Sequence, residues 1–394
     1  MTILPSRRAL FGMAAAVGGA IALPGTAAAA SVPGSLRPGG RYDRYLRQLA
    51  DADQFSGTVQ VAYRDHPVLT RSYGMADKER GIPNRTDTIY ALASASKPFT
   101  GLAVVQLAER DKLRFHDTLG RHLGGFAAEV AEKVTVHHLL THTSGLAHPD
   151  PASRPERVFT GIEERTEYLK QYAREMVLKD VPGTKKSYNS PGYEILGELV
   201  AAISGKPFHT YVREHIFAPA GMDRSAYYTR PEWLSDPRIA HPYALQADGS
   251  RVDCVRHLDK GAISGLPGSN SARAFIGSGG GNGFSTAPEL LSFARALREG
   301  KLLDRAYHEL YVNGKISAAP MGSPDPLRGE SFHAYGPVAG LYRKQRVIGH
   351  GGGIAGGSTN WSIYLDRDWT GVVLCNYDLD VEAIIAEERE AVLG

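Results

Sequence analysis

Hydrophobic positions follow two different spacings along this chain of 394 residues. Near both ends, apolar and β-branched residues partly alternate with polar ones, which is the pattern of half-buried strands. In the middle, apolar residues recur every three or four positions, which is the pattern of amphipathic helices. The predicted strands are residues 55–63, 68–73, 335–342, 346–349, 360–365 and 371–376. The predicted helices are residues 41–51, 94–109, 135–140, 163–179, 191–204, 208–217, 289–298 and 381–393.

This distribution of elements predicts an α+β fold in which the two ends of the chain share one sheet. Residues of about 40–90 and 335–394 would supply an antiparallel sheet flanked by the terminal helices 41–51 and 381–393. Residues of about 91–334 would form an inserted, mainly helical domain. We expect a functional site in the cleft between these two parts.

The first 30 residues have the composition of an export signal. The basic pair Arg7-Arg8 precedes an apolar run of small residues, 12–23, and residues 26–30 offer small-residue cleavage sites. This order is typical of a signal peptide, and paired arginines are typical of twin-arginine export. A membrane anchor is the alternative, but the run is short and ends at a proline. We therefore predict that residues 1–30 are removed and that the mature protein is periplasmic or extracellular.

The near-neutral charge of the chain argues against a nucleic acid or an anionic membrane as its partner. The chain has 45 Lys and Arg against 42 Asp and Glu, and loss of Arg7 and Arg8 with the signal leaves 43 basic residues. No run of Lys or Arg indicates a nucleic-acid or anionic-membrane partner. No segment after the signal is long and apolar enough to span a membrane.

The chain has two cysteines, Cys254 and Cys375, which are too few for a disulfide framework. Cys375 lies in the apolar stretch 371–376, which is predicted to be a buried strand. A core thiol is therefore favoured over a bridge, although the sequence leaves the pairing of the two cysteines open.

The stretch with the clearest chemistry is Ser94-Ala-Ser-Lys97, which opens a largely apolar run to residue 108. A helix that is apolar on most sides is a buried one. Residues three apart share a helix face, so a hydroxyl and an amine would meet at the N-terminus of a buried helix. Unpaired backbone N–H groups there favour negative charge. This setting is typical of an activated serine nucleophile.

Four further segments follow Ser94–Lys97 in an informative order. They are Leu139-Leu-Thr-His-Thr-Ser-Gly-Leu146, Tyr188-Asn-Ser190, Gly283-Phe-Ser-Thr-Ala287 and His350-Gly-Gly352. Together the five segments resemble the serine β-lactamase and penicillin-binding protein superfamily, in its class C β-lactamase, DD-carboxypeptidase and esterase branch. The resemblance covers roughly residues 40–392 and implies that residues 31–394 form one catalytic domain of that fold.

The resemblance implies a role for each matching residue. Ser94 would be the nucleophile, and Lys97 would accept or relay its proton. Tyr188 would take that proton and later deliver it to the leaving group. The backbone N–H groups of Ser94 and Gly353 would form the oxyanion hole.

The second motif departs from the family pattern. The family usually carries Tyr-x-Asn, whereas this chain has Tyr188-Asn189-Ser190. In the family, that asparagine commonly helps to hold the substrate amide and the lysine. Ser190 is expected to bind substrate in its place with less reach, or Asn189 to substitute after a local backbone shift.

The third motif departs as well. Lactamases of this branch more often have Lys-Thr-Gly, whereas this chain has His350-Gly351-Gly352. His350 is expected to bind substrate, but it is shorter than lysine and only fractionally charged at neutral pH. Gly351 and Gly352 would let the substrate backbone or ester approach closely.

Other readings of the same residues are weaker. His138 and His142 lie four apart, but Leu139 stands where a zinc motif of the His-Glu-x-x-His kind has glutamate. The glycine-rich stretch 277–283 lacks the Lys-Ser/Thr of a phosphate loop. No Gly-x-Ser-x-Gly occurs, which argues against an α/β-hydrolase. We predict no metal and no cofactor.

The sequence thus predicts an exported serine hydrolase that forms an acyl-enzyme at Ser94 on a small-molecule or peptide substrate. D-Ala-D-Ala peptides, β-lactams and small esters all stay open, as does the oligomeric state. The alternative is a penicillin-recognising sensor that is acylated but turns over poorly; a non-catalytic scaffold is disfavoured because Ser94, Lys97 and Tyr188 are all present. Specificity is expected to depend on the weakly patterned stretches 225–275 and 315–335.

Overall fold

The computed structural model describes residues 32–149, 157–260, 270, 276–318 and 329–394. The predicted signal, residues 1–30, lies outside the described residues, as do parts of the two stretches that we expect to set specificity. Residues 33–394 form one compact unit, and the description below is of that unit.

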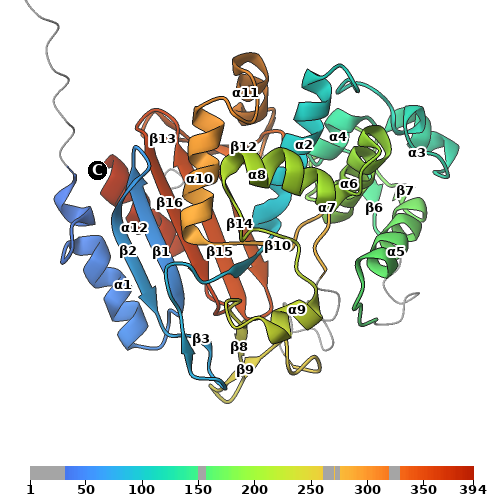
Figure 1. Cartoon of the computed structure of the whole chain (residues 1–394). Coiled ribbons are helices and arrows are strands. Elements are labelled where there is room, and N and C mark those ends of the chain that lie inside the picture. Colours follow the sequence, from blue (N-terminus) through green and yellow to red (C-terminus); the bar gives the residue numbers. More distant parts are fainter. Residues whose placement is uncertain (1–31, 150–156, 261–269, 271–275, 319–328) are drawn as a thin grey trace, which may run out of the picture. The chain divides into compact units, whose positions relative to one another are not determined.

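Strands from the two ends of the chain pair in one eight-stranded antiparallel sheet (Figure 1). From edge to edge its strands are β11 (Ile316–Ser317), β12 (Glu330–His333), β13 (Val338–Tyr342), β14 (Gln345–Ile354), β15 (Gly357–Tyr364), β16 (Trp369–Cys375), β1 (Gly57–Tyr63) and β2 (His66–Tyr73). The two ends join at β1 and β16, where Gly57 faces Cys375 and Tyr63 faces Trp369. The predicted α+β fold, with an antiparallel sheet built from both chain ends, is confirmed.

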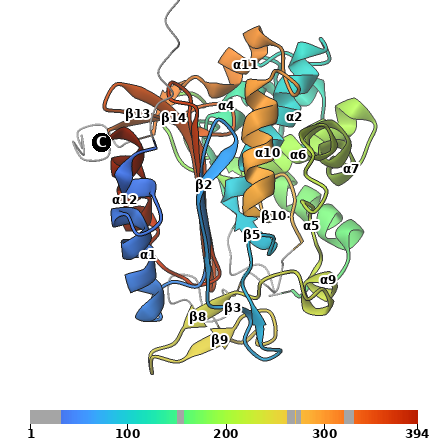
Figure 2. The ribbon, with the colours of Figure 1, turned by 60° about the vertical axis from the view of Figure 1, so that its left-hand side comes forward.

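Helices cover both faces of this sheet, as the turned view in Figure 2 shows. On one face lie the terminal helices α1 (Arg41–Asp51) and α12 (Glu382–Leu393). On the other lie α2 (Lys97–Glu109), α10 (Ala287–Arg298) and other helices from the middle of the chain. Both α10 and α12 contact β16, so the sheet is buried between two helical layers.

The middle of the chain supplies the remaining elements. Its other helices are α3 (Ala128–Lys133), α4 (Val136–Leu140), α5 (Ile162–Arg174), α6 (Ser190–Ser204), α7 (Phe208–Val212), α8 (Ala218–Ala220), α9 (Arg230–Ser235) and α11 (Arg305–Val312). Four two-stranded pairs join β3 (Met75–Asp77) to β4 (Ile82–Pro83), β5 (Tyr90–Ala93) to β10 (Gly283–Ser285), β6 (Leu146–Ala147) to β7 (Val177–Leu178) and β8 (Tyr243–Leu245) to β9 (Arg251–Asp253).

The helix α2 is buried on all sides because its sequence is apolar nearly all round. Every residue from Lys97 to Ala108 is buried. Phe99 packs edge-on against Phe217 and Phe293, each with ring centroids 5.1 Å apart. The helix also contacts α6 and α11. A helix enclosed in this way is a rigid support for the residues at its N-terminus.

Several elements differ from the prediction. The sheet gains β11 and β12 before its predicted start at residue 335, and α11 precedes them. The sequence Glu330-Ser-Phe-His333 has no β-branched residue, so pairing with β13, and not a local pattern, makes it a strand. The helix predicted over 163–179 ends at Arg174, because Val177 and Leu178 pair with β6 instead.

Both cysteines are free and buried. Burial raises the pKa of Cys254 and of Cys375 to about 12. Both thiols are therefore protonated near neutral pH and are packing groups, not nucleophiles.

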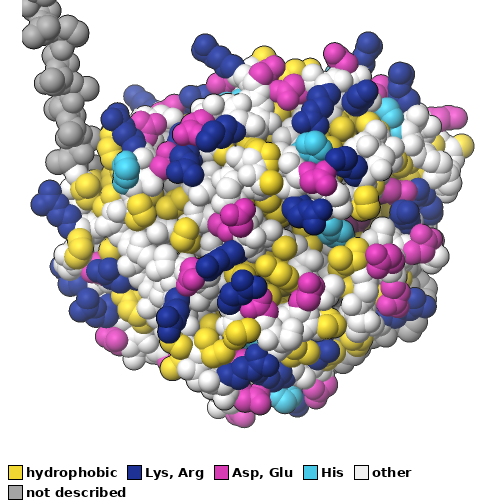
Figure 3. Space-filling model, viewed as in Figure 1, with side chains coloured by type: hydrophobic (Ala, Val, Ile, Leu, Met, Phe, Trp, Pro, Cys, Tyr) yellow, Lys and Arg dark blue, Asp and Glu magenta, His cyan; other side chains and the backbone are white. Residues whose placement is uncertain are grey.

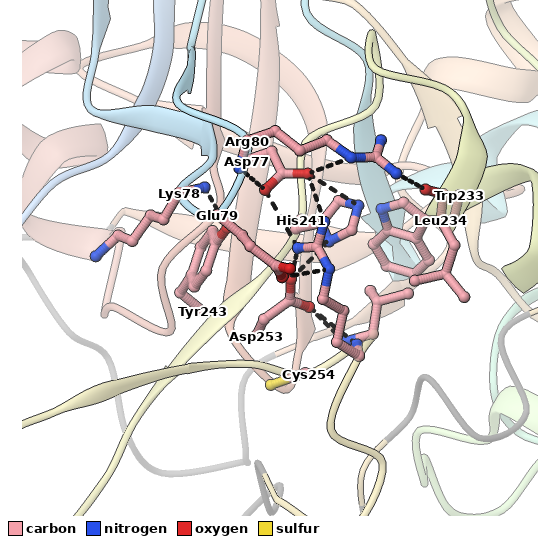
Figure 4. A network of polar contacts seen from close by, with 12 residues as sticks. Asp77, Lys78, Glu79, Arg80, Trp233, Leu234, His241, Tyr243, Asp253 and Cys254 are labelled. Atoms are coloured by element: carbon pink, nitrogen blue, oxygen red, sulfur yellow. Dashed lines mark hydrogen bonds and ion pairs between the residues drawn. The ribbon is translucent and has the colours of Figure 1, made fainter.

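A buried polar network ties β3 to the segment around β9 (Figure 4). Arg256 donates hydrogen bonds to Asp77 Oδ2, at 2.7 Å, and to Asp253 Oδ2. His241 Nδ1 lies 2.7 Å from Asp253 Oδ2. Burial alone would raise the pKa of both carboxyls, but Arg256 and His241 outweigh it and lower both. The two aspartates are therefore held as buried anions.

Charged side chains of both signs are intermixed on the face shown in Figure 3, as the near-neutral composition leads one to expect. Within the described part of the chain, no helix combines the length and the apolar character that crossing a membrane requires.

Candidate active site

Ser94 lies on a tight turn between β5 and α2. The residue before it, Ala93, has φ 48° and ψ −130°, a conformation that costs free energy for any residue with a side chain. Ser96 Oγ and Asn282 N–H both donate to Ala93 O, at 2.8 and 2.9 Å, and so hold the turn. In the stretch 88–108 every residue except Ser94 is buried. Ser94 is thus the one partly exposed residue of an otherwise buried segment.

Lys97 follows as the first residue of α2 and is 0% exposed. Its Nζ donates to Ser94 Oγ at 2.9 Å and to Gly280 O at 2.5 Å. No carboxylate among the described residues forms an ion pair with it. The side-chain nitrogen of Lys97 therefore lies beneath the partly exposed hydroxyl of Ser94, with a backbone carbonyl and not an acid as its second partner.

The glycine-rich loop supplies that carbonyl, and sequence reasoning missed this role. Gly279 O accepts a hydrogen bond from Thr100 Oγ1 at 2.8 Å, one turn along α2 from the Gly280 contact. A Cβ at Gly279 would lie 2.3 Å from Tyr193 O, and one at Gly280 would lie 2.2 Å from Glu194 Oε1. Because Tyr193 O is a backbone atom of α6, only glycine at position 279 lets the loop lie this close to the helix. The run of glycines was the available signal, but nothing local indicates which group their carbonyls meet.

Tyr188 lies in the loop before α6, with 43% of its surface exposed. The Nζ of Lys97 is 5.1 Å from the centroid of its ring and 5.9 Å from that of Tyr193. The structure thus brings Ser94, Lys97 and the ring of Tyr188 together from two parts of the chain.

Three buried histidines surround Tyr188. The ring centroids of His142, His333 and His350 lie 4.4, 6.5 and 6.5 Å from that of Tyr188. Burial lowers the pKa of His333 to about 4 and of His350 to about 3, with Lys186 and Lys97 respectively adding to the effect. Burial, followed by nearby positive groups, also lowers the pKa of His142 well below its usual value. All three are neutral at pH 7, and no group of three or more His, Cys, Asp and Glu in the described residues is arranged to hold a metal ion.

The depressed pKa of His333 predicts a loss of stability in acid. Between about pH 6.5 and pH 4 the unfolded chain binds a proton at this histidine and the folded chain does not, so stability falls as the pH falls. His333→Gln removes this proton. Urea unfolding should show that the variant loses about 2 kcal/mol less stability than the wild type between pH 7 and pH 5. Above pH 7.5 the two should respond equally to pH; parallel losses in acid would contradict the assignment.

The strand β14 forms the opposite wall. Its pairing with β13 ends at Gly349, so the segment from His350 to Ile354 pairs with β15 alone. A Cβ at Gly352 would lie 2.1 Å from Leu92 O and 2.9 Å from Ala95 N, so this glycine allows the strand to pack on the Ser94 turn. A Cβ at Gly353 would meet nothing within 4 Å. There is therefore open space beside β14 where the oxyanion hole is predicted.

His350 is turned toward its own backbone. Its side chain is buried, and Nδ1 lies 2.6 Å from the carbonyl oxygen of Gly351. The imidazole is neutral for the reason given above, so β14 presents no fixed positive charge at this position.

Asn189 has structural partners for both ends of its amide. Its Oδ1 caps α6 by accepting from Gly192 N–H at 3.0 Å, and its Nδ2 donates to Leu146 O at 2.8 Å. Substrate binding by this side chain would require those contacts to break. Ser190, the first residue of α6, is half-buried. The signal for the cap was present in the sequence, since Asn-Ser-Pro is a typical helix start.

Comparison with known proteins gives relatives of one family. A family model described as Beta-lactamase matches residues 42–393. Penicillin-binding protein 4* of Bacillus subtilis (strain 168) is 28% identical over 355 residues, which cover 85% of this chain and 71% of that protein. Esterase EstB of Burkholderia gladioli is 33% identical over 217 residues, which cover 52% of this chain and 54% of the esterase. A crystal structure of a penicillin-binding protein from Bacillus halodurans matches with a TM-score of 0.73 and 25% identity, over 88% of this chain and 98% of that one.

Proposed function

Because this chain belongs to the Beta-lactamase family of serine hydrolases, we propose that it hydrolyses an ester or an amide through an acyl-enzyme formed at Ser94. One observation carries the proposal: the buried Lys97 donates to the single partly exposed hydroxyl of its segment, at 2.9 Å. A serine in contact with a group that can take up or relay its proton is the general arrangement of an activated nucleophile.

In the proposed reaction, Lys97 relays the proton of Ser94 Oγ to Tyr188 as this oxygen attacks the carbonyl carbon. The resulting oxyanion accepts hydrogen bonds from the N–H groups of Ser94 and Gly353, and one such donor is typically worth ~3 kcal/mol. Collapse of the tetrahedral intermediate breaks the bond to the leaving group, which receives the proton through Tyr188. Water then attacks the acyl ester, and Ser94 Oγ regains a proton as the acid leaves.

The substrate that this site suits best is an ester or amide without a free carboxylate beside the scissile bond. The support is the neutral, inward-turned His350, which gives β14 no fixed charge to bind a carboxylate. D-Ala-D-Ala peptides and β-lactams both carry such a carboxylate. Among the relatives, the protein from Burkholderia gladioli is named as an esterase.

A substrate panel tests this proposal. Turnover of a p-nitrophenyl ester, nitrocefin and a D-Ala-D-Ala peptide is measured for the wild type and for Ser94→Ala. We expect the ester to be hydrolysed fastest and Ser94→Ala to abolish its hydrolysis. Full activity of Ser94→Ala would show that the nucleophile is wrong. Faster turnover of the peptide or of nitrocefin would refute the substrate preference alone.

The same panel separates an enzyme from a penicillin-recognising sensor. A sensor would be labelled stoichiometrically at Ser94 by a fluorescent penicillin, would retain the label, and would show no multiple turnover of any substrate. The relative in Bacillus subtilis carries a penicillin-binding name, which is why this outcome is tested directly.

We further propose that residues 1–30 direct twin-arginine export and are then removed. The support is the order of the basic pair Arg7-Arg8, the apolar run and the small-residue cleavage sites in the sequence. N-terminal sequencing of the protein recovered outside the cytoplasm tests it, and an intact N-terminus would refute cleavage.

A further inference from the structure

We propose that His142 is a positioning residue for Tyr188: it holds the tyrosine ring over Lys97 by packing against the ring and by binding the main chain on both sides of it. This inference rests on the proposed function, in which Tyr188 moves the proton of Ser94. His142 itself does not touch substrate in this proposal. It acts through the tyrosine.

The main-chain contacts bracket the tyrosine. Ser187 N–H donates to the carbonyl oxygen of His142 at 2.9 Å, and Asn189 N–H donates to its Nδ1 at 3.1 Å. His142 therefore binds the backbone N–H groups of the two residues that flank Tyr188. His142 is placed to do so by its own conformation, with φ 58°, two residues after the end of α4.

The ring contacts fix the side chain as well. The imidazole of His142 lies between two tyrosine rings, with centroids 4.4 Å from Tyr188 and 5.0 Å from Tyr193. Tyr193 is rigid, because it is 1% exposed on α6 and its hydroxyl donates to Leu140 O at 2.8 Å. His333 closes a third side, with its ring centroid 4.9 Å from that of His142. The buried rings of His142, Tyr193 and His333 thus hold the exposed ring of Tyr188 in one orientation.

The arrangement requires a neutral imidazole. Nδ1 can accept the Asn189 N–H only while it carries no proton, so the ring proton sits on Nε2. The ionisable groups that face the ring are Tyr188, Tyr193, His333, His350, Lys97 and Lys186. Together with burial, the positive ones among them keep His142 unprotonated.

Substitutions at this position separate the two kinds of contact. His142→Phe keeps a flat ring against Tyr188 but removes the Nδ1 acceptor. His142→Asn keeps a short polar acceptor but removes the ring. In the p-nitrophenyl ester assay we expect each to lower kcat by about 10-fold, with KM changed less than 3-fold, because small misplacements of a reacting group cost rate and not binding. The matched control is His137→Phe on α4, whose Nδ1 contacts Tyr335 Oη instead, and it should retain the wild-type kcat.

The deciding measurement is a double-mutant cycle with Tyr188→Phe. If His142 acts through the tyrosine hydroxyl, His142→Phe should cause no further loss of kcat once that hydroxyl is gone. A loss that persists undiminished in the Tyr188→Phe background would show a general structural role and overturn the inference. So would an unchanged kcat in both His142 variants, or an equal loss in His137→Phe.

The failure of this inference is distinguishable from failure of the proposed function. Full turnover by Ser94→Ala, or wild-type kcat in Tyr188→Phe, would refute the proposed chemistry and the inference with it. The positioning role alone would be refuted by a different result. In that result Ser94→Ala and Tyr188→Phe each lower kcat strongly, but the losses caused by His142→Phe and Tyr188→Phe simply add in the double variant. Circular dichroism and the thermal midpoint of each variant show whether the variant is folded in the assay.

Discussion

Replacing Lys97 by methionine is expected to lower kcat/KM for ester hydrolysis by about 10³-fold, within the range of a lost general base. Methionine has a similar length but neither a charge nor a proton to exchange. Ser94 Oγ would lose the partner that now lies 2.9 Å away, and the site would lose the nitrogen that faces the ring of Tyr188. The measurement is steady-state hydrolysis of a p-nitrophenyl ester, together with the rate at which a fluorophosphonate labels Ser94.

The matched control for this prediction is Lys185→Met. Lys185 is a largely exposed lysine in the loop before Tyr188, and its Nζ is 3.7 Å from a carboxylate oxygen of Asp180. We expect its variant to keep the wild-type rate. Since Lys97 is buried without an acid partner, its variant should be at least as stable as the wild type, so lost activity would not reflect unfolding. A rate within a few-fold of wild type in Lys97→Met would refute the role of Lys97.

The second large effect concerns stability. Arg256→Met is expected to lower the free energy of unfolding by about 3–5 kcal/mol at pH 7, the usual cost of removing one partner of a buried ion pair. Asp77 and Asp253 are only 2% and 8% exposed, and both rely on this guanidinium for their charge. Urea denaturation of the purified protein measures the change.

Two comparisons sharpen the stability experiment. Arg238→Met breaks an ion pair with Asp236 whose arginine side chain is 59% exposed, and such surface pairs contribute at most about 1 kcal/mol. Adding Asp253→Asn to Arg256→Met should recover part of the loss, because one uncompensated buried charge disappears. Equal losses of unfolding free energy in Arg256→Met and Arg238→Met would show that the ion pairs of Arg256 with Asp77 and Asp253 do not stabilise the fold.

The sequence predicts the fold better than it predicts the boundaries of the sheet. The partial alternation and β-forming residues of 55–63 and the continuous apolar run of 371–376 identify these segments as strands without any knowledge of their pairing. In β12, by contrast, only the neighbouring strand makes Glu330-Ser-Phe-His333 extended. The sequence therefore indicates the strands that carry their own pattern, and the tertiary pairing decides the others.

The same distinction holds in the candidate site. The contact between Ser94 and Lys97 follows from a spacing of three residues, which any helix-like turn converts into proximity. The contact between Lys97 and Gly280 joins segments far apart in the chain, and no local pattern encodes it. The neutral state of His350 is likewise hidden in the sequence, because it results from burial and from the nearby Lys97. Asn189 is different, because the sequence Asn-Ser-Pro itself indicates a helix cap. The family pattern led us to predict substrate binding for this residue, whereas in the structure its side chain caps α6.

The pairing of β1 with β16 also determines when the central sheet can be completed during folding. Ribosomes make β1 early and β16 near the end of the described chain, so the hairpin of β1 and β2 must wait with an open edge for its neighbour. Pairing strands so distant in sequence is slow, and an open edge in the meantime invites association with other chains. Substitutions that weaken the facing positions, such as Val59 and Val373, should therefore reduce the yield of soluble protein before they reduce the activity of the molecules that fold.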